Sequence, residues 1–174
     1  MQMSDTRQID ADPAIVWAAL LNPEVLKAAV PGCESLTGTP EDGFEAVVVQ
    51  KVGPVKARFT GLVTISDRVE GESLTLSGEG KGGAAGFARG EARVRLQPAE
   101  GGTSLQYEVD AKVGGKLAQL GSRIIDGFAR KMADEFFTRF QAAVEGPDDE
   151  AESAEVDDKT GAKKGWFKRM LGSD

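Results

Sequence analysis

The pattern of hydrophobic and polar residues begins with a weak strand followed by two helix starts. Residues 4–10 alternate only loosely and predict a short strand. Asp12-Pro13 and Asn22-Pro23 each place an N-cap residue before a proline, which is favoured at the first helical position. The sequence therefore predicts two short helices in direct succession, over 13–21 and 23–29.

From Glu34 to Val113 the apolar residues recur at every second position, which is typical of strands with one buried face. Between 55 and 65, for example, Phe59 and Val63 fall on the side opposite to the polar residues. Five turn signals separate the runs: Glu41-Asp42-Gly43, Gly53-Pro54, Glu70-Gly71, Gly82-Gly83 and Gly101-Gly102. Six or seven sequential strands with short turns predict an antiparallel meander that is solvated on its other face.

The last periodic segment has apolar residues three or four positions apart, from about Leu117 to Val144, and predicts one long helix. Its apolar positions are Leu117, Leu120, Ile124, Phe128, Met132, Phe136 and Phe140. The order of strand, two short helices, sheet and long helix has one economical packing. The predicted class is α+β, with a curved antiparallel sheet of six to seven strands wrapped around the long C-terminal helix.

The inner face of this sheet offers small side chains to a bulky helix. They are Ala57, Gly61, Gly78, Gly80, Ala88, Gly90 and Ala92. Either helix and sheet pack in the ordinary way, or a void remains for an apolar ligand. Candidate lining residues are Phe59, Val63, Ala88, Tyr107, Leu120, Ile124, Phe128, Met132 and Phe136. The hydroxyl of Tyr107 could meet the polar end of a ligand or donate to a backbone carbonyl.

The C-terminal part divides the chain into a domain, 1–145, an acidic linker, 146–162, and a basic amphipathic tail, 163–174. On a helical wheel the apolar tail residues lie together, opposite Lys168 and Arg169. The predicted membrane-contacting residues are Lys163, Lys164, Trp166, Phe167, Lys168, Arg169, Met170 and Leu171. The alternatives are a disordered end, or a tail that docks on the domain or on a partner protein.

The amino-acid composition excludes several classes of ligand and of catalytic site. The net charge of -7 divides into -4 for 1–145, -6 for 146–162 and +3 for 163–174, and this acidity argues against nucleic-acid binding. Histidine is absent and Cys33 is the only cysteine, so Ser-His-Asp and Cys-His pairs and Cys/His metal cages are excluded. Glycine-rich 78–86 has strands on both sides, so it predicts a bent hairpin rather than a phosphate loop. We expect no catalytic residues and no metal.

Targeting signals are missing from the sequence as given. The first residues lack a signal-peptide profile, and no run approaches the roughly 20 apolar residues that span a bilayer. The expected location is the cytoplasm, with peripheral attachment to the inner face of the cell membrane.

Four motifs occur in order along the domain. They are Pro31-Gly32-Cys33-Glu34, the stretch from Lys51 to Gly61, the stretch from Gly114 to Arg123, and the run from Asp126 to Ala133. Together they resemble the G-subunit family of aerobic carbon monoxide dehydrogenases. The resemblance covers about Met1 to Val144. It implies the helix-grip fold of START-like, or Bet v 1-like, proteins. It also implies an accessory protein, without redox chemistry of its own, that couples a molybdenum hydroxylase of the carbon monoxide dehydrogenase type to the cytoplasmic membrane.

The functional hypothesis joins cavity and tail. The domain is expected to bind a lipophilic small molecule, foremost a respiratory quinone, with no covalent cofactor, and to present it to the molybdenum hydroxylase. One alternative is a membrane-recruitment scaffold without a ligand. Another is a START-like enzyme, such as a cyclase or hydrolase, which would need ionisable groups converging inside the cavity.

Overall fold

The computed structural model describes residues 1–145, so the predicted linker and tail lie outside the described residues. By its contacts the chain divides into Met1–Phe140 and Gln141–Asp174. The fold below is that of the first unit, and of the second only residues 141–145 are described. The elements in chain order are β1 (Gln2–Ile9), α1 (Pro13–Leu20), α2 (Pro23–Ala29), β2 (Cys33–Thr39), β3 (Gly43–Val52), β4 (Val55–Val69), β5 (Ser73–Lys81), the 3-10 turn η1 (Gly83–Ala85), β6 (Phe87–Ala99), β7 (Gly102–Gly114), α3 (Lys116–Gln119) and α4 (Ser122–Glu145).

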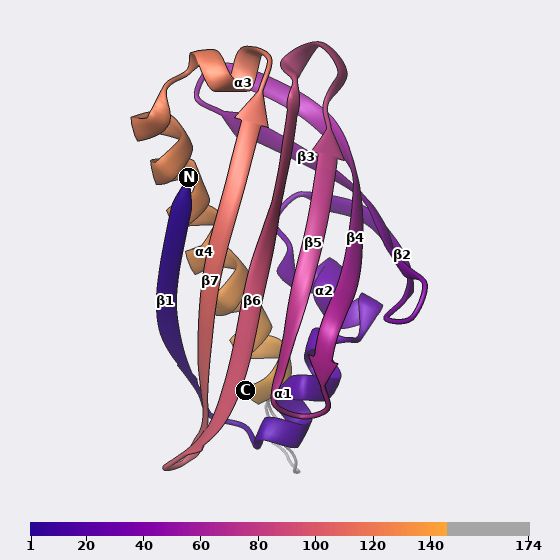
Figure 1. The fold of residues 1–174 in the computed structure, drawn as a ribbon, viewed down its shortest axis with the longest axis vertical. Coiled ribbons are helices and arrows are strands. Elements are labelled where there is room, and N and C mark those ends of the chain that lie inside the picture. Colours follow the sequence, from indigo (N-terminus) through magenta and orange to yellow (C-terminus); the bar gives the residue numbers. More distant parts are fainter. Residues whose placement is uncertain (146–174) are drawn as a thin grey trace, which may run out of the picture. The chain divides into compact units, whose positions relative to one another are not determined.

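All seven strands form one antiparallel sheet in the order β1-β7-β6-β5-β4-β3-β2. The meander from β2 to β7 follows the chain, and β1 pairs with the far side of β7. Figure 1 shows the sheet in front, with α4, α1 and α2 behind it. The predicted α+β fold with a curved sheet, two short helices and a long final helix is confirmed.

The antiparallel order sends alternate turns to opposite ends of the sheet. At one end lie the β3–β4 turn, the β5–β6 loop with η1, and α3, and we call this the α3 end. At the other lie the turns β2–β3, β4–β5 and β6–β7 together with α1, and we call this the α1 end. Trp17 of α1 donates to Glu70 in the β4–β5 turn at 2.9 Å, which holds α1 in place.

The two short helices begin where their cap residues predict. Asn22 accepts a hydrogen bond from the backbone N–H of Glu24 at 2.9 Å, and Pro23 takes the first helical position. Asp12 precedes Pro13 with an extended backbone but makes no side-chain cap bond. Both helices therefore start at the predicted proline.

The predicted single helix from Leu117 is wrong at its first turns. Gly121 has φ of +91°, a left-handed conformation that a continuous α-helix does not allow, and it separates α3 from α4. Leu117 on α3 is buried, and with Val52 and Ile125 it forms a cluster that closes the α3 end.

Many of the buried side chains lie toward the two ends of the unit. The α1 end holds Ile9, Phe44, Leu74, Leu96 and Leu105 on the strands near its turns, together with Val16 and Leu20 of α1. The cluster of Val52, Leu117 and Ile125 lies at the α3 end. Elsewhere Val94, Tyr107 and Phe137 are also buried, whereas Phe59, Val63 and Met132 are half-buried.

Candidate functional site

The middle of the inner sheet face is a floor of small residues. Strand pairing places Gly61 opposite Gly80, and Gly78 opposite Gly90. Ala88 lies beside Gly80 on the next strand. By the alternation of the strands these positions face the same side as Phe59 and Val63. At these positions the three adjacent strands β4 to β6 present almost no side-chain volume toward the helix layer, although Phe59 and Val63 flank them on β4.

The helix layer does not contact this floor at the distance of a Cβ atom. A Cβ placed on Gly61 would meet two carbonyl oxygens of neighbouring strands at 3.6 and 3.9 Å. One on Gly78 would meet Val63 and Leu62 at 3.5 and 3.6 Å, and one on Gly80 would meet only the Cβ of Phe59 at 4.0 Å. No atom of the described helices lies within 4 Å of a Cβ at any of the three positions. The sheet and helix therefore do not interlock here as a close-packed interior would.

The predicted lining residues fall into three groups. Phe59, Val63, Ala88, Phe128, Met132 and Phe136 are half-buried on the facing sides of the sheet and α4. Leu120 and Ile124 lie at the α3 end against Gly53 of the β3–β4 turn, and Ile124 is 40% exposed. The third group is Tyr107 alone, which is buried. Phe59 and Phe128 of the first group also pack against the cluster at the α3 end, and Ile124 lies at the surface.

Tyr107 belongs to a polar cluster that sequence reasoning missed. Its ring stacks on Phe137 with centroids 5.3 Å apart, and its hydroxyl is among the groups that raise the pKa of Arg7 on β1. The guanidinium of Arg7 lies 5.0 Å from the Phe137 ring centroid and pairs with Asp134 of α4. Arg7 thus connects the Tyr107–Phe137 stack to Asp134.

Arg7, Asp5 and Asp134 form a group of charged side chains between the edge strand β1 and α4. Burial lowers the pKa of Arg7, but its hydrogen bonds to Asp134 and Tyr107 raise that pKa by more, so the net direction is upward. Asp5, two positions back on the same face of β1, lies 3.4 Å from the Nε of Arg7. The cluster ties the edge strand to α4 and places the Arg7 guanidinium against the ring of Phe137.

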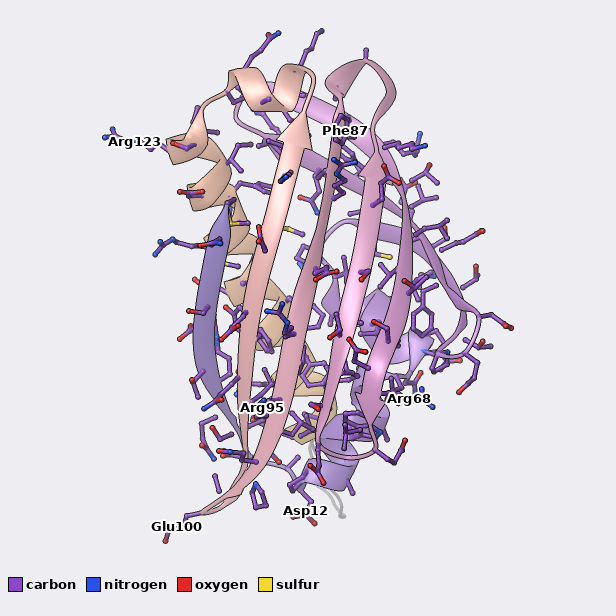
Figure 2. The ribbon with its side chains drawn as sticks, in the orientation of Figure 1. Asp12, Arg68, Phe87, Arg95, Glu100 and Arg123 are labelled. Carbon is purple, nitrogen blue, oxygen red and sulfur yellow. The ribbon has the colours of Figure 1, made fainter. Side chains whose placement is uncertain are left out.

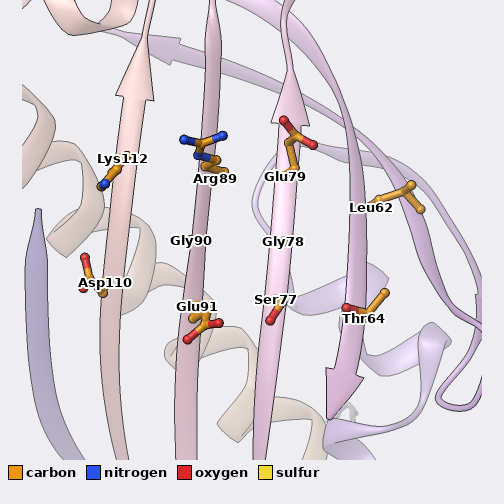
Figure 3. A pocket seen from close by; sticks show the side chains of 10 residues that line it. All are labelled: Leu62, Thr64, Ser77, Gly78, Glu79, Arg89, Gly90, Glu91, Asp110 and Lys112. Atoms are coloured by element: carbon orange, nitrogen blue, oxygen red, sulfur yellow. The ribbon is translucent and has the colours of Figure 1, made fainter.

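The outer face of the sheet carries a separate shallow depression of about 650 Å³. Figure 3 shows it on the side away from α4, over the backbones of Gly78 and Gly90. Three carboxylates (Glu79, Glu91, Asp110) and two cations (Arg89, Lys112) surround it, with Leu62, Thr64 and Ser77. A second outer-face depression of about 280 Å³ lies nearer the α1 end. Open, mixed-charge surfaces of this kind do not shield a lipophilic molecule from water.

The described residues offer few other reactive or metal-binding groups. Within residues 1–145, no group of three or more His, Cys, Asp or Glu side chains could hold a metal ion. Cys33 is half-buried, its Sγ donates to the Ser35 carbonyl at 3.3 Å, and burial raises the pKa of the thiol. Across the described part of the chain, no helix combines the length and apolar character needed to cross a bilayer.

Comparison with solved structures defines the class. A conserved protein from Geobacillus kaustophilus superposes with a TM-score of 0.78 at 27% identity, covering 84% of this chain and 96% of that one. A protein from Thermus thermophilus gives 0.66 at 17% identity, covering 86% and 100%. Ara h 8.0201 gives 0.58 at 13% identity, covering 84% and 99%, and these last two likenesses show the fold alone. The fold is the helix-grip fold of Bet v 1-like proteins.

The sequence then defines the family. A family model for CoxG, the G subunit of carbon monoxide dehydrogenase, matches residues 6–145. The chain belongs to this family, which confirms the resemblance found in its motifs. A search of the curated proteins gave no match.

Proposed function

We propose that this protein is a non-catalytic accessory protein that holds a lipophilic ligand, foremost a respiratory quinone, between its sheet and α4. It couples a molybdenum hydroxylase of the carbon monoxide dehydrogenase type to the cytoplasmic membrane. The observation that supports the ligand is the inner floor at Gly61, Gly78 and Gly80, where no helix atom lies within 4 Å of an added Cβ, together with the half-buried aromatic side chains on the facing sides of the sheet and α4. The family description supports the partner.

The chemistry of the interior suits a quinone. Apolar and aromatic walls shield an isoprenoid chain, whose transfer from water is favourable by about 0.8 kcal/mol for each buried CH₂. The Arg7–Tyr107 pair lies where a quinone carbonyl would find hydrogen-bond donors. A quinone resides in lipid while a soluble hydroxylase does not, so a carrier that excludes water joins the two.

The tail supplies the membrane contact in this proposal. Trp166, Phe167, Met170 and Leu171 would contribute on the order of 4–8 kcal/mol if fully buried, and less at an interface. Each of the four basic tail residues would add about 1 kcal/mol near anionic lipid. Together these terms give reversible attachment rather than permanent insertion.

The ligand is tested by extraction and by occlusion. Organic extraction of the purified full chain, followed by mass spectrometry, is expected to release an isoprenoid quinone. Gly61→Leu fills the floor and is expected to reduce quinone loading at least tenfold. The matched control is Thr60→Leu, the adjacent residue on the outer face, which should load normally. Recovery of no hydrophobic ligand, together with no uptake of added quinone, would leave the ligand-free scaffold as the function.

A further inference from the structure

The charges of the folded domain are separated toward its two ends. The segments that form the α3 end, residues 51–56, 81–87 and 114–125, contain five basic residues and no acidic one. The α1-end segments 10–12, 40–43, 67–72 and 98–102 contain eight acidic residues and one basic one. Figure 2 labels Arg123 at the α3 end, and Asp12 and Glu100 at the α1 end. The net charge of the domain conceals this polarity.

The two ends also differ in how their charges are paired. At the α1 end the basic residue, Arg68, lies 3.3 Å from Glu41 and 3.9 Å from Glu70. Within residues 1–145, no ion-pair partner is found for the five basic residues of the α3 end: Lys51, Lys56, Lys81, Lys116 and Arg123. Lys51 and Lys56 are even direct partners across the β3–β4 hairpin, a pairing of like charges that costs stability. Folding alone does not explain such an arrangement.

An apolar tip lies among these cations. Pro54 is exposed in the β3–β4 turn, and Ile124 at the start of α4 is 40% exposed. The two are parts of one surface, because a Cβ on Gly53 would lie 3.5 Å from Ile124 and 3.9 Å from Leu120. Exposed apolar side chains ringed by unpaired lysine and arginine are the composition that binds at the interface of an anionic bilayer.

We propose that the α3 end of the folded domain docks on an anionic phospholipid surface. Pro54 and Ile124 enter the headgroup region, and the five basic residues contact lipid phosphates. The acidic α1 end then faces away from the membrane. This proposal shares with the proposed function only the attachment of the chain to a membrane. Its test needs no ligand.

The test uses the full chain with the tail disabled by Trp166→Ser, Phe167→Ser, Met170→Ser and Leu171→Ser. In this background Lys51→Gln, Lys56→Gln, Lys116→Gln and Arg123→Gln are combined, and co-sedimentation with phosphatidylcholine–phosphatidylglycerol vesicles is measured. Removing four cations near the surface is expected to weaken binding by at least about a hundredfold. The control combines Lys27→Gln, Arg95→Gln, Arg130→Gln and Lys131→Gln, which has the same net charge and should bind as the parent does.

A second measurement gives the orientation. With Cys33→Ser, a fluorophore on Ile124→Cys is expected to be quenched by brominated lipid in the same vesicles, and one on Glu100→Cys is not. Equal loss of binding in both charge variants would reduce the effect to net charge and overturn the proposal, as would equal quenching at the two positions. Unchanged binding in the α3-end variant would also overturn the proposal, and an acidic protein would then be the better candidate partner for this surface. Quinone extraction from the same samples reports on the proposed function separately.

Discussion

At the scale of the residue, three glycines of the inner floor are informative because neither their backbone angles nor their neighbours require glycine. Gly61, Gly78 and Gly80 lie outside the left-handed region, so a side chain is not excluded by φ. Glycine inside a strand costs about 0.5–1 kcal/mol relative to alanine. Three such residues side by side therefore lower the stability of the fold, a cost that the proposed space for a ligand would explain.

This interpretation makes a prediction about stability that needs no ligand. Gly61→Leu is expected to raise the free energy of unfolding by about 1 kcal/mol, because it removes backbone entropy from the unfolded chain and buries an apolar side chain in open space. A filled interior would instead give a loss of about 1–3 kcal/mol from overpacking. Urea denaturation of Gly61→Leu beside Thr60→Leu, which should change stability by less than about 0.5 kcal/mol, distinguishes the two.

Cys33 gives a prediction that depends on pH. Burial raises the pKa of its thiol and outweighs the opposing effect of Lys27, so the folded state favours the protonated form. The stability associated with this preference is present below the unfolded pKa and is lost as pH rises through the folded pKa. Alkylation by iodoacetamide should consequently reach half its maximal rate at a higher pH in the folded chain than in urea. Coinciding midpoints would contradict the assignment, and Cys33→Ser provides the blank.

At the scale of the element, the sequence predicted every strand and turn of the meander because each turn carries its own glycine, proline or acidic signal. The break before α4 was not predicted. Leu117 and Leu120 continue the apolar spacing of the helix, and Gly121 alone does not distinguish a tolerated helical glycine from one at positive φ. The apolar spacing correctly predicted that Leu117 is buried. It wrongly predicted that Leu117 belongs to the long helix, since this residue lies on α3.

The two glycines of this region should respond in opposite directions to alanine. Gly121→Ala forces a Cβ into φ of +91° and is expected to cost about 1–2 kcal/mol of unfolding free energy. Gly127→Ala lies on an exposed turn of α4, where an added Cβ meets nothing within 4 Å, and should gain up to about 1 kcal/mol. Thermal unfolding of the two variants checks both signs, and a loss at Gly127 would mean that its face of α4 is covered.

The candidate site was only partly predictable, because a sequence pattern shows local alternation but not which distant segments meet. The small residues of the floor follow from strand alternation, which the sequence displays. The Arg7 cluster joins β1 to α4 across 127 positions and depends on which side of a weakly alternating strand faces inward. Ile124 fits the apolar spacing of a helix, yet it is 40% exposed and lies against the β3–β4 turn. For both Arg7 and Ile124, the position in the fold rather than the residue type determines which groups the side chain contacts.

At the scale of the whole molecule, charge that is scattered in sequence becomes ordered by topology. Alternate turns of a meander go to opposite ends, so acidic residues in turns β2–β3, β4–β5 and β6–β7 gather at one end without being neighbours in the chain. Composition alone suggests that an acidic domain on an acidic linker is repelled from anionic lipid. The fold offers a basic end that removes this objection and gives the tethered domain a preferred orientation.

Tail and domain should therefore contribute separably to membrane binding. Deleting residues 146–174 is expected to abolish co-sedimentation with phosphatidylcholine vesicles and to weaken binding to phosphatidylglycerol-containing vesicles by about a hundredfold, since the apolar tail residues are lost. The remaining anionic binding should weaken steeply as added salt shortens the screening length, because exposed charges supply most of it. Quinone loading and the unfolding temperature should stay unchanged, since the family match ends at residue 145. Undiminished sedimentation of the deleted chain on both kinds of vesicle would remove the tail from the mechanism and leave the basic end as the membrane contact.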